Sequence, residues 1–326
     1  MNKLCQWLRI IGPCLAAVSA ATAAHAQADN YPNKAVSIIS DAAPGSTPDV
    51  DARFVAEGLS KIWGQQVIVI NHPGANGSIA ARIATEAVPD GYTLFMPALS
   101  TFAALPSIAP NLPLKLPRDF IPIGYTAENP MFFAVTPSLG VSTLPELIAL
   151  AKKDPGKISI AVTGVGRLTH LTGLVFQDRA GISLLPVPYN GGPAAALADV
   201  AGGRVSMIIE GYSGIVGSVK AGQVKLIAVA SPERLPQFPD LPTVAETIPG
   251  FAARGWQVLV APLGTPAPII SKVSADLAKV VSDPDFKKRL SNIGSYSRAM
   301  TPEQVLAFVQ KEQDTWLPVL QKISDK

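Results

Sequence analysis

Two short loops rich in glycine and proline constrain this chain most, because each follows an apolar run and precedes an alanine-rich stretch. The first is residues 43–49, Ala-Pro-Gly-Ser-Thr-Pro-Asp, and the second is residues 71–80, Asn-His-Pro-Gly-Ala-Asn-Gly-Ser-Ile-Ala. Small residues let backbone N–H groups approach a ligand, and a helix after the loop adds the positive end of its dipole. The sequence therefore predicts two adjacent anion-sized cradles, and it indicates binding before catalysis.

The apolar pattern around these loops predicts a parallel sheet. The expected elements, in chain order, are a strand at 36–39, a helix at 49–62, a strand at 67–70, a helix at 78–87 and a strand at 92–96. Strands and helices that alternate at this spacing form a parallel sheet with right-handed crossovers, and its ligands bind beyond the carboxyl ends of the strands. We expect both loops, together with Ser100 and Thr101, at that edge.

A second α/β unit is expected after a proline-rich, irregular segment at 97–122. Its strands are expected at 132–135, 158–162, 184–187, 205–209 and 226–230, and its helices at 144–153, 171–179, 193–201 and 215–221. The chain is then expected to return with a strand at 257–260 and helices at 269–281, 285–290 and 302–320. We therefore expect lobe 1 to comprise residues 27–127 and 251–326, and lobe 2 to comprise residues 128–250, around a hinged cleft.

The first 26 residues have the pattern of a secretory signal peptide. Lys3 and Arg9 supply a positive start, residues 10–24 are apolar and small, and residues 24–26 read Ala-His-Ala, a typical cleavage site. No later run is long enough to predict a membrane span. We expect export to the periplasm. Lipidation at Cys14 is the alternative, although a proline precedes it where a small residue is usual.

The composition excludes several classes of site. Both cysteines, Cys5 and Cys14, lie in the expected signal peptide, so the exported part has no disulfide, thiolate metal site or cysteine nucleophile. The formal net charge of +3 falls to +1 without Lys3 and Arg9, which leaves no electrostatic footprint for nucleic acid. The acidic pair within residues 49–51 lacks the clustered partners of a metal site, and no P-loop or complete dinucleotide loop is present. We expect no metal and no cofactor.

Ordered motifs from residue 31 to the C-terminal region match a known family. They are Tyr31 to Lys34, Pro44-Gly45 with Asp49 and Arg53, Asn71 with Pro73 to Ala75 and Gly77, Pro89 to Leu94, Asp119-Phe120 with Pro122-Ile123, Pro155 to Lys157, Gly164 and Gly166 with His170-Leu171, Val187 to Gly191, Pro242 to Glu246, Ala261-Pro262 with Gly264 to Pro266, and Trp316. With these motifs the chain resembles the periplasmic solute-binding proteins of tripartite tricarboxylate transporters, the Bug proteins.

The resemblance implies a type II periplasmic binding fold with two lobes. It implies that loops 43–49 and 74–78 of lobe 1 grip a carboxylate through backbone N–H groups and ordered waters. It also implies that loops 163–170 and 189–192 of lobe 2 select the rest of the ligand. The candidate ligand-binding residues carried over by position are Ser46, Thr47, Asp49, Ala75, Asn76, Ser78, Ser100, Thr163, Arg167, His170, Tyr189 and Asp199.

Three positions depart from the family pattern. Ser46 and Asn76 stand where the family usually has glycine, so they add a hydroxyl donor and an amide or a residue that tolerates left-handed backbone. Arg167 stands where the family commonly has a small residue with a hydroxyl group. Its guanidinium could hold a second carboxylate through two parallel hydrogen bonds, or it could be a solvated loop arginine paired with a surface acid. The first interpretation predicts a dicarboxylate ligand.

Aromatic residues near the expected cleft extend this prediction. Phe102, Phe132, Phe133 and Tyr189 could accommodate a flat aromatic diacid such as terephthalate, and core packing is the alternative role for them.

The remaining polar residues near the loops have less direct roles. Asp49 is expected to cap its helix and order the N–H groups of the loop rather than touch an anion. For His170, ligand contact and support of the loop remain equally open, whereas His72 is expected to be structural.

We therefore expect a monomeric periplasmic solute-binding protein, not an enzyme. It would capture a small carboxylate and deliver it to the subunits of a membrane transporter. One alternative is a secreted hydrolase with Ser213 as nucleophile, although Gly211-Tyr212-Ser213-Gly214 lacks the spacing of a hydrolase elbow. Another alternative is a sensor module that presents its closed form to a signalling protein.

Overall fold

The computed structural model of the chain describes residues 30–103, 115–164, 166–189 and 192–324. The expected signal peptide at 1–26 lies outside these residues. The strands are β1 (Val36–Ser40), β2 (Val67–Asn71), β3 (Thr93–Met96), β4 (Phe120–Val135), β5 (Ser159–Val162), β6 (Leu185–Pro188), β7 (Met207–Gly211), β8 (Lys225–Val229) and β9 (Arg254–Pro262). The helices are α2 (Thr47–Trp63), α3 (Ser78–Thr85), α4 (Leu99–Ala103), α6 (Leu144–Lys153), α7 (Leu168–Ala180), α8 (Pro193–Ala201), α9 (Tyr212–Lys220), α10 (Ala267–Ser282), α11 (Pro284–Ser291) and α12 (Pro302–Ser324), with short 3-10 turns η1 (Ala75–Gly77), η2 (Pro137–Leu139) and η3 (Val244–Glu246).

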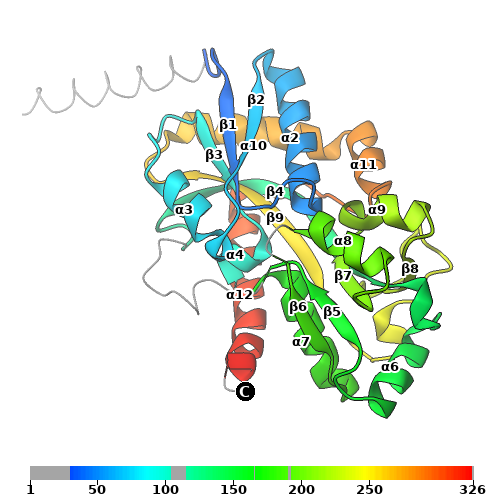
Figure 1. The fold of residues 1–326 in the computed structure, drawn as a ribbon. Helices are drawn as coiled ribbons and strands as arrows, with labels where there is room; N and C mark the ends of the chain where they lie inside the picture. Colours follow the sequence, from blue (N-terminus) through cyan, green and yellow to red (C-terminus); the bar gives the residue numbers. More distant parts are fainter. Residues whose placement is uncertain (1–29, 104–114, 165, 190–191, 325–326) are drawn as a thin grey trace, which may run out of the picture.

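The strands of the described chain form one curled sheet in the order β2-β1-β3-β9-β4-β7-β5-β6, with β8 also paired to β4. As the sequence predicted, β1 pairs in parallel with both β2 and β3. In the second half, β5 pairs in parallel with β6 and β7. Figure 1 shows these two groups of strands, each surrounded by its own helices. The expected α/β fold with two lobes is confirmed.

Strand β4 belongs to both lobes. From Phe120 to Pro130 it pairs antiparallel with β9 in lobe 1, and from Met131 to Val135 it pairs antiparallel with β7 in lobe 2. Strand β9 leads back from lobe 2 and lies between β3 and β4. The chain therefore crosses between the lobes along two hydrogen-bonded strands. The expected lobe boundaries near residues 127 and 251 remain a prediction.

Strand β4 is much longer than the strand predicted at 132–135. It begins at Phe120, so the prediction that the chain is irregular up to residue 122 was wrong for the last residues of that segment. Pro122 and Pro130 lie inside β4 and interrupted the apolar pattern on which the prediction rested. The pairing with β9 shifts register between Pro122 and Gly124, so a bulge accommodates the first proline. Helix α4 also lies in the segment predicted to be irregular.

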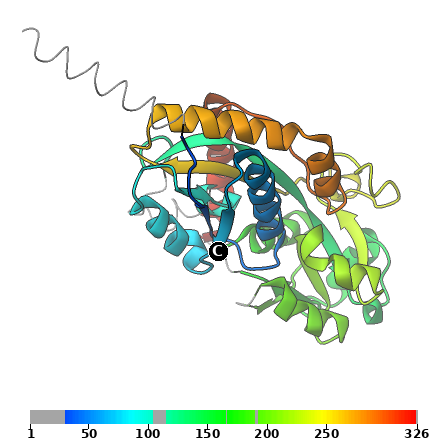
Figure 2. The same cartoon turned by 90° about the horizontal axis from the view of Figure 1, so that it is seen from above.

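Buried apolar side chains join the helices to the sheet. In lobe 1, Val55 and Leu59 of α2 and Val273 of α10 pack with Leu94 of β3 and Leu259 of β9. Figure 2 shows α10 running along the face of the sheet. No helix within residues 30–324 that the structure describes is both long and apolar enough to cross a bilayer.

Helix α12 covers the strands that link the lobes. The ring of Phe308 packs edge-on against Tyr125 of β4 and Trp256 of β9, with centroid distances of 5.3 Å in both pairs. The indole of Trp256 also donates to Glu312 at 2.8 Å. These contacts hold the C-terminal helix against the crossing strands.

Candidate ligand-binding site

A pocket of about 440 Å³ lies between the two lobes. Its wall in lobe 1 comes from the loops after β1, β2 and β3, and its wall in lobe 2 comes from the loop after β5, the start of α8 and Glu210 at the end of β7. These loops follow the carboxyl ends of their strands, as the sequence predicted for the glycine loops. The volume is in the range of pockets that enclose small organic ligands.

The loop after β1 is shaped by its own polar groups. The Ser46 hydroxyl donates to the Ala43 carbonyl at 2.7 Å, and the Ser46 N–H donates to the same carbonyl at 3.1 Å. Gly45 adopts left-handed backbone with φ of 77°, which a side chain would disfavour. The result is a tight turn that ends at the first residue of α2.

Asp49 stabilises this turn without lining the pocket. Its carboxylate accepts the Gly45 N–H at 2.9 Å, the Arg53 guanidinium at 2.9 Å and the Asn71 amide at 2.8 Å. Asp49 is 3% exposed and is not among the pocket-lining residues. This geometry agrees with the expectation that Asp49 orders the loop from outside the pocket. The expectation that Asp49 caps its helix was wrong, because α2 begins two residues earlier, after Ser46, and the Asp49 carboxylate turns back to Gly45.

The loop after β2 has four consecutive residues with positive φ. Gly74, Ala75, Asn76 and Gly77 have φ of 112°, 44°, 55° and 94°. The left-handed backbone expected for Asn76 is therefore present. At Gly77 a Cβ would lie 2.7 Å from Asp41 Oδ2, so this position has no room for a side chain. The unusual backbone brings η1 and the start of α3 against the end of β1.

Uncapped helix N-termini from both lobes border the pocket. Ser46, Arg167 and Gly192 precede the first residues of α2, α7 and α8, all three line the pocket, and none of them caps its helix with a side chain. The first N–H groups of a helix have no partner within the helix, and together they act as a partial positive charge. Pro48 and Pro193 have no N–H, so the pocket offers the remaining N–H groups of these helix starts to an anion.

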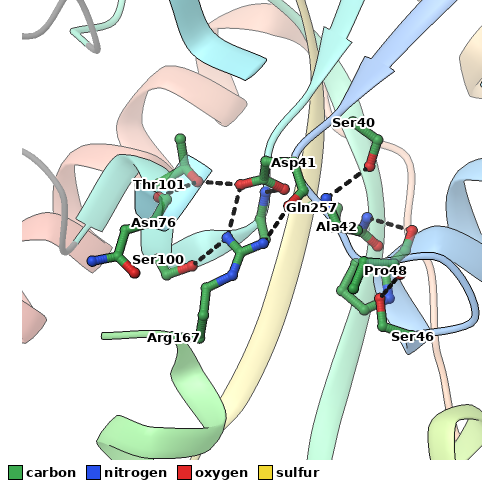
Figure 3. A network of polar contacts seen from close by, with 12 residues as sticks. Ser40, Asp41, Ala42, Ser46, Pro48, Asn76, Ser100, Thr101, Arg167 and Gln257 are labelled. Carbon is green, nitrogen blue, oxygen red and sulfur yellow. Dashed lines mark hydrogen bonds and ion pairs between the residues drawn. The ribbon is translucent and has the colours of Figure 1, made fainter. Parts of the chain in front are cut away.

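Arg167 reaches across from lobe 2 and pairs with Asp41 of lobe 1 (Figure 3). Its Nη1 donates to Asp41 Oδ2 at 3.0 Å and to Ser100 Oγ at 3.1 Å, while its Nη2 donates to the Asp41 carbonyl. The Asp41 side chain is fully buried and that of Arg167 is 20% exposed. The sequence offered two roles for Arg167, and the structure shows a third, because its partner is a buried acid of the other lobe.

Asp41 is held by further donors. Its Oδ1 accepts the Ala98 N–H at 3.2 Å, and its Oδ2 accepts the Thr101 hydroxyl. These two donors hold the carboxylate against Ala98 and the start of α4 independently of Arg167. Arg167 neutralises this charge, so the pair as a whole adds no net charge to the pocket.

Glu210, at the end of β7, is the other ionisable residue of the described pocket wall. Its carboxyl accepts the Gly211 N–H at 3.0 Å and the Thr163 hydroxyl at 2.9 Å. Burial raises the pKa of Glu210, and the two hydrogen bonds and the nearby charge of Arg167 oppose this rise. Glu210 was not among the residues predicted from the sequence, although its place at the carboxyl end of a predicted strand was a usable signal.

The lobes touch at several points around the pocket. A Cβ at Gly166 would lie 2.8 Å from the Asn76 amide, and one at Gly192 would lie 3.1 Å from the Cβ of Ala43. At Gly211 a Cβ would lie 2.7 Å from the Cβ of Thr47. Glycines therefore allow the close approach of the two lobes, and the structure is a closed form.

Ser213 takes part in the same contact between the lobes. Its hydroxyl donates to Thr47 Oγ1 at 2.7 Å. The residue considered as a hydrolase nucleophile thus lies where the lobes meet, with its hydrogen engaged by a threonine.

A polar cluster lies beneath the pocket, where the lobes join. The lining residue Asn129 donates to Asp51 Oδ2 at 2.5 Å and to Ser295 Oγ at 2.7 Å. Burial raises the pKa of Asp51 to about 7. Among the described residues, Asp51 Oδ1 and Gln257 Oε1 are buried without a hydrogen-bond partner.

The structure gathers seven of the twelve predicted site residues at the pocket. These are Ser46, Thr47, Ala75, Asn76, Ser100, Thr163 and Arg167. The other five, which do not line it in the described part of the chain, are Asp49, Ser78, His170, Tyr189 and Asp199. The ligand contacts themselves remain predictions for all twelve.

The residues outside the pocket have other partners. His170 Nδ1 accepts the N–H of Gly166 at 3.1 Å, and burial lowers the pKa of His170. This contact supports the loop that carries Arg167. Tyr189 donates its hydroxyl to Asp199, which also pairs with the exposed Arg204. The neighbouring residues 190–191 lie outside the described chain.

The aromatic residues expected near the cleft pack elsewhere. Phe102, Phe132 and Phe133 are fully buried in the hydrophobic clusters. The pocket wall instead includes Trp256 of β9, which the sequence analysis did not consider. Core packing, the alternative role, therefore accounts for the three phenylalanines.

Comparison with known proteins gives consistent matches over nearly the whole chain. Residues 51–324 match the family described as Tripartite tricarboxylate transporter family receptor. A UPF0065 protein of Bordetella bronchiseptica is 32% identical over 97% of this chain and 93% of its own length. Protein BugT of Bordetella pertussis is 31% identical over 98% of each chain.

Solved structures show the same fold. Rpa4515 of R. palustris, solved with adipate, superposes with a TM-score of 0.85 at 29% identity, over 90% of this chain and 98% of that one. The periplasmic binding protein BugD gives a TM-score of 0.81 at 32% identity, over 90% and 98%. MatC of Rhodopseudomonas palustris, with bound malate, gives 0.80 at 28% identity, over 89% and 100%.

Proposed function

Because the chain belongs to the tripartite tricarboxylate transporter receptor family, we propose that it captures a small organic carboxylate between its lobes and delivers it to a membrane transporter in the periplasm. The match to a periplasmic binding protein supports this location. The adipate and malate bound by two structural neighbours support the class of ligand.

One observation carries this proposal: the N-termini of α2, α7 and α8 border the pocket, and no side chain caps them. Backbone amides at helix N-termini bind carboxylates without a positively charged side chain. Hydrogen bonds to a charged group contribute about 1.5–3 kcal/mol each, and micromolar affinity needs about 8 kcal/mol. Four to six such bonds, less the cost of association, are enough for a transport receptor.

We place the carboxylate at the loops after β1 and β2 rather than at Arg167. Arg167 already donates to Asp41 at 3.0 Å, and a ligand carboxylate would have to compete with this buried acid. A dicarboxylate that uses Arg167, or an aromatic diacid such as terephthalate, would need that pair to open. Trp256 is the aromatic side chain of the described pocket wall that could contact such a ring.

A thermal-shift screen tests the proposal. The purified protein is heated with mono-, di- and tricarboxylates and, as matched controls, with the corresponding carboxamides. Since a ligand that binds the folded state raises the melting temperature, at least one acid should raise it and its amide should not. A screen in which no acid shifts the melting curve, or in which amides act equally, would contradict carboxylate capture.

A further inference from the structure

The charges at the pocket indicate what the ligand carries where it faces lobe 2, if the proposed function holds. Arg167 and Glu210 are the ionisable side chains in the described wall. Arg167 is neutralised by Asp41 at 3.0 Å. Glu210 forms no salt bridge within the described chain, although the Arg167 charge acts on it from a distance. The carboxyl of Glu210 is therefore the uncompensated charge at this wall.

The carboxyl of Glu210 has acceptor capacity to spare. It receives one donor on each oxygen, Gly211 N–H on Oε1 and Thr163 Oγ1 on Oε2. A carboxylate has about four acceptor sites, so about half of them are unused. The residue is only 4% exposed, which leaves little water to occupy them. A buried acceptor of this kind is stabilised by a donor from the ligand.

The two hydrogen bonds from Gly211 and Thr163 favour the ionised form of Glu210, as does the nearby charge of Arg167, and they oppose the rise in pKa that burial causes. Gly211 is moreover the residue before α9, so the carboxylate lies at a helix N-terminus, where negative charge is stabilised. An ionised Glu210 repels a second carboxylate and attracts an ammonium or hydroxyl group.

We infer that Glu210 selects ligands that carry a hydrogen-bond donor, an ammonium or a hydroxyl, at the part of the ligand that faces β7 of lobe 2. The anion lies at the uncapped start of α2 and the loops after β1 and β2 in lobe 1, and the donor meets Glu210 of lobe 2. The ligand class is therefore an amino- or hydroxycarboxylate rather than a simple dicarboxylate.

Matched acids test this inference by calorimetry. Each set consists of four unbranched acids of one chain length that differ only in the substituent on one carbon: a hydrogen, a hydroxyl, an ammonium or a second carboxylate. The set is then repeated with the substituent on each successive carbon. For at least one position, the amino or hydroxy acid should bind at least about tenfold more tightly than the unsubstituted acid. The matching dicarboxylate should gain no such advantage.

The Glu210→Gln variant tests the residue itself. Glutamine keeps the shape and can still accept the Gly211 N–H, so the fold is preserved while the charge is lost. The advantage of the donor-bearing acid should fall at least about tenfold, and the unsubstituted acid should change by less than about threefold. Glu233→Gln, at an exposed position of the same lobe, is the matched control and should leave every affinity unchanged.

The outcomes separate this inference from the proposed function. If dicarboxylates bind most tightly at every chain length, or if Glu210→Gln leaves the donor-bearing acid unaffected, the inference is wrong while carboxylate capture stands. If no acid of any class binds the wild-type protein, the proposed function fails as well. Because the comparison of acids uses the wild-type chain, the inference can be overturned even if the variant does not fold.

Discussion

Arg167 and Asp41, 126 positions apart in the sequence, form an ion pair of 3.0 Å that joins the two lobes across the pocket. The pair connects the residue before α7 in lobe 2 with the residue after β1 in lobe 1. It therefore belongs to the closed form, and lobe separation must break it. From the sequence, the guanidinium of Arg167 appeared to be available to a ligand, but in the structure it binds Asp41 and joins the lobes.

Arg167→Ser should destabilise the protein by about 2–3 kcal/mol, because it leaves the buried carboxylate of Asp41 without its cation. Affinity should fall by a similar factor for monocarboxylates and dicarboxylates, since the variant weakens closure. Chemical denaturation and calorimetry measure the two effects. The double variant Asp41→Asn with Arg167→Ser should regain most of the stability. A loss confined to dicarboxylates would instead show that Arg167 holds a distal carboxylate.

Gly211→Ala should obstruct closure while leaving each lobe folded. Gly211 has ordinary backbone with φ of −65°, but its Cβ would lie 2.7 Å from the Cβ of Thr47 in the other lobe. We expect at least about tenfold weaker binding of the tightest acid, or about 1.4 kcal/mol, and a radius of gyration that no longer decreases with ligand in small-angle scattering. Gly217→Ala is the control, since a Cβ there meets nothing within 4 Å. Equal binding by both variants would contradict a role for this contact.

Asp51 should make the protein less stable as pH rises from about 4 to about 7. Its pKa is raised from 3.8 to about 7 by burial, so in this range the folded state holds a proton that the unfolded state has lost. Stability therefore falls with rising pH and levels off above the folded pKa, after a loss of about 4 kcal/mol. Asp51→Asn should remove most of this dependence in melting curves.

Asp276 is the control for this pH prediction, because its pKa is shifted in the opposite direction. Burial acts to raise the pKa of Asp276, but hydrogen bonds from Lys279, Lys272 and the indole of Trp63 outweigh it and lower the pKa. Asp276→Asn should lower stability at neutral pH, the opposite of Asp51→Asn. The difference between wild type and Asp51→Asn also separates Asp51 from Glu210, whose pKa burial raises too. A wild-type pH profile that Asp51→Asn does not change would contradict the assignment.

Asp49→Ala should weaken carboxylate binding although Asp49 does not line the pocket. The change frees the Gly45 N–H and removes one of the hydrogen-bond partners of Arg53 and of Asn71, so the turn after β1 loses its fixed geometry. We expect a stability loss of about 1–2 kcal/mol and a reduced affinity for every acid. Glu57→Ala, on the exposed side of the same helix, should leave affinity unchanged. An unaltered affinity in Asp49→Ala would show that the turn needs no such support.

The sequence predicted what depends on local pattern. The parallel strands beside the glycine loops and the supporting position of Asp49 follow from apolar runs, turn residues and helix starts. The left-handed backbone at Asn76 follows from its place where the family usually has glycine. The full length of strand β4 was not predicted, because Pro122 and Pro130 interrupt its apolar pattern. The strand is held by pairing with β9, which is remote in sequence. Local signals cannot show such pairing.

The same limit applies to the site. Single residues such as Thr163 could be placed at the pocket through the resemblance to the Bug proteins, whose ligand-binding loops map onto this chain by position. The partner of Arg167 could not be predicted, since Asp41 meets it only when the lobes close. Glu210 was overlooked because an acid at the end of an apolar strand has no motif around it, and its relation to Thr163 exists only in the fold.

A crystal structure of the protein with its tightest-binding acid would show directly which groups hold the ligand. We expect a carboxylate between the lobes, with its oxygens accepting backbone N–H groups of the loops at residues 42–48 and 73–76. The Arg167–Asp41 pair should remain intact. A carboxylate bound by Arg167 in place of Asp41, or an acid bound outside this pocket, would contradict this expectation.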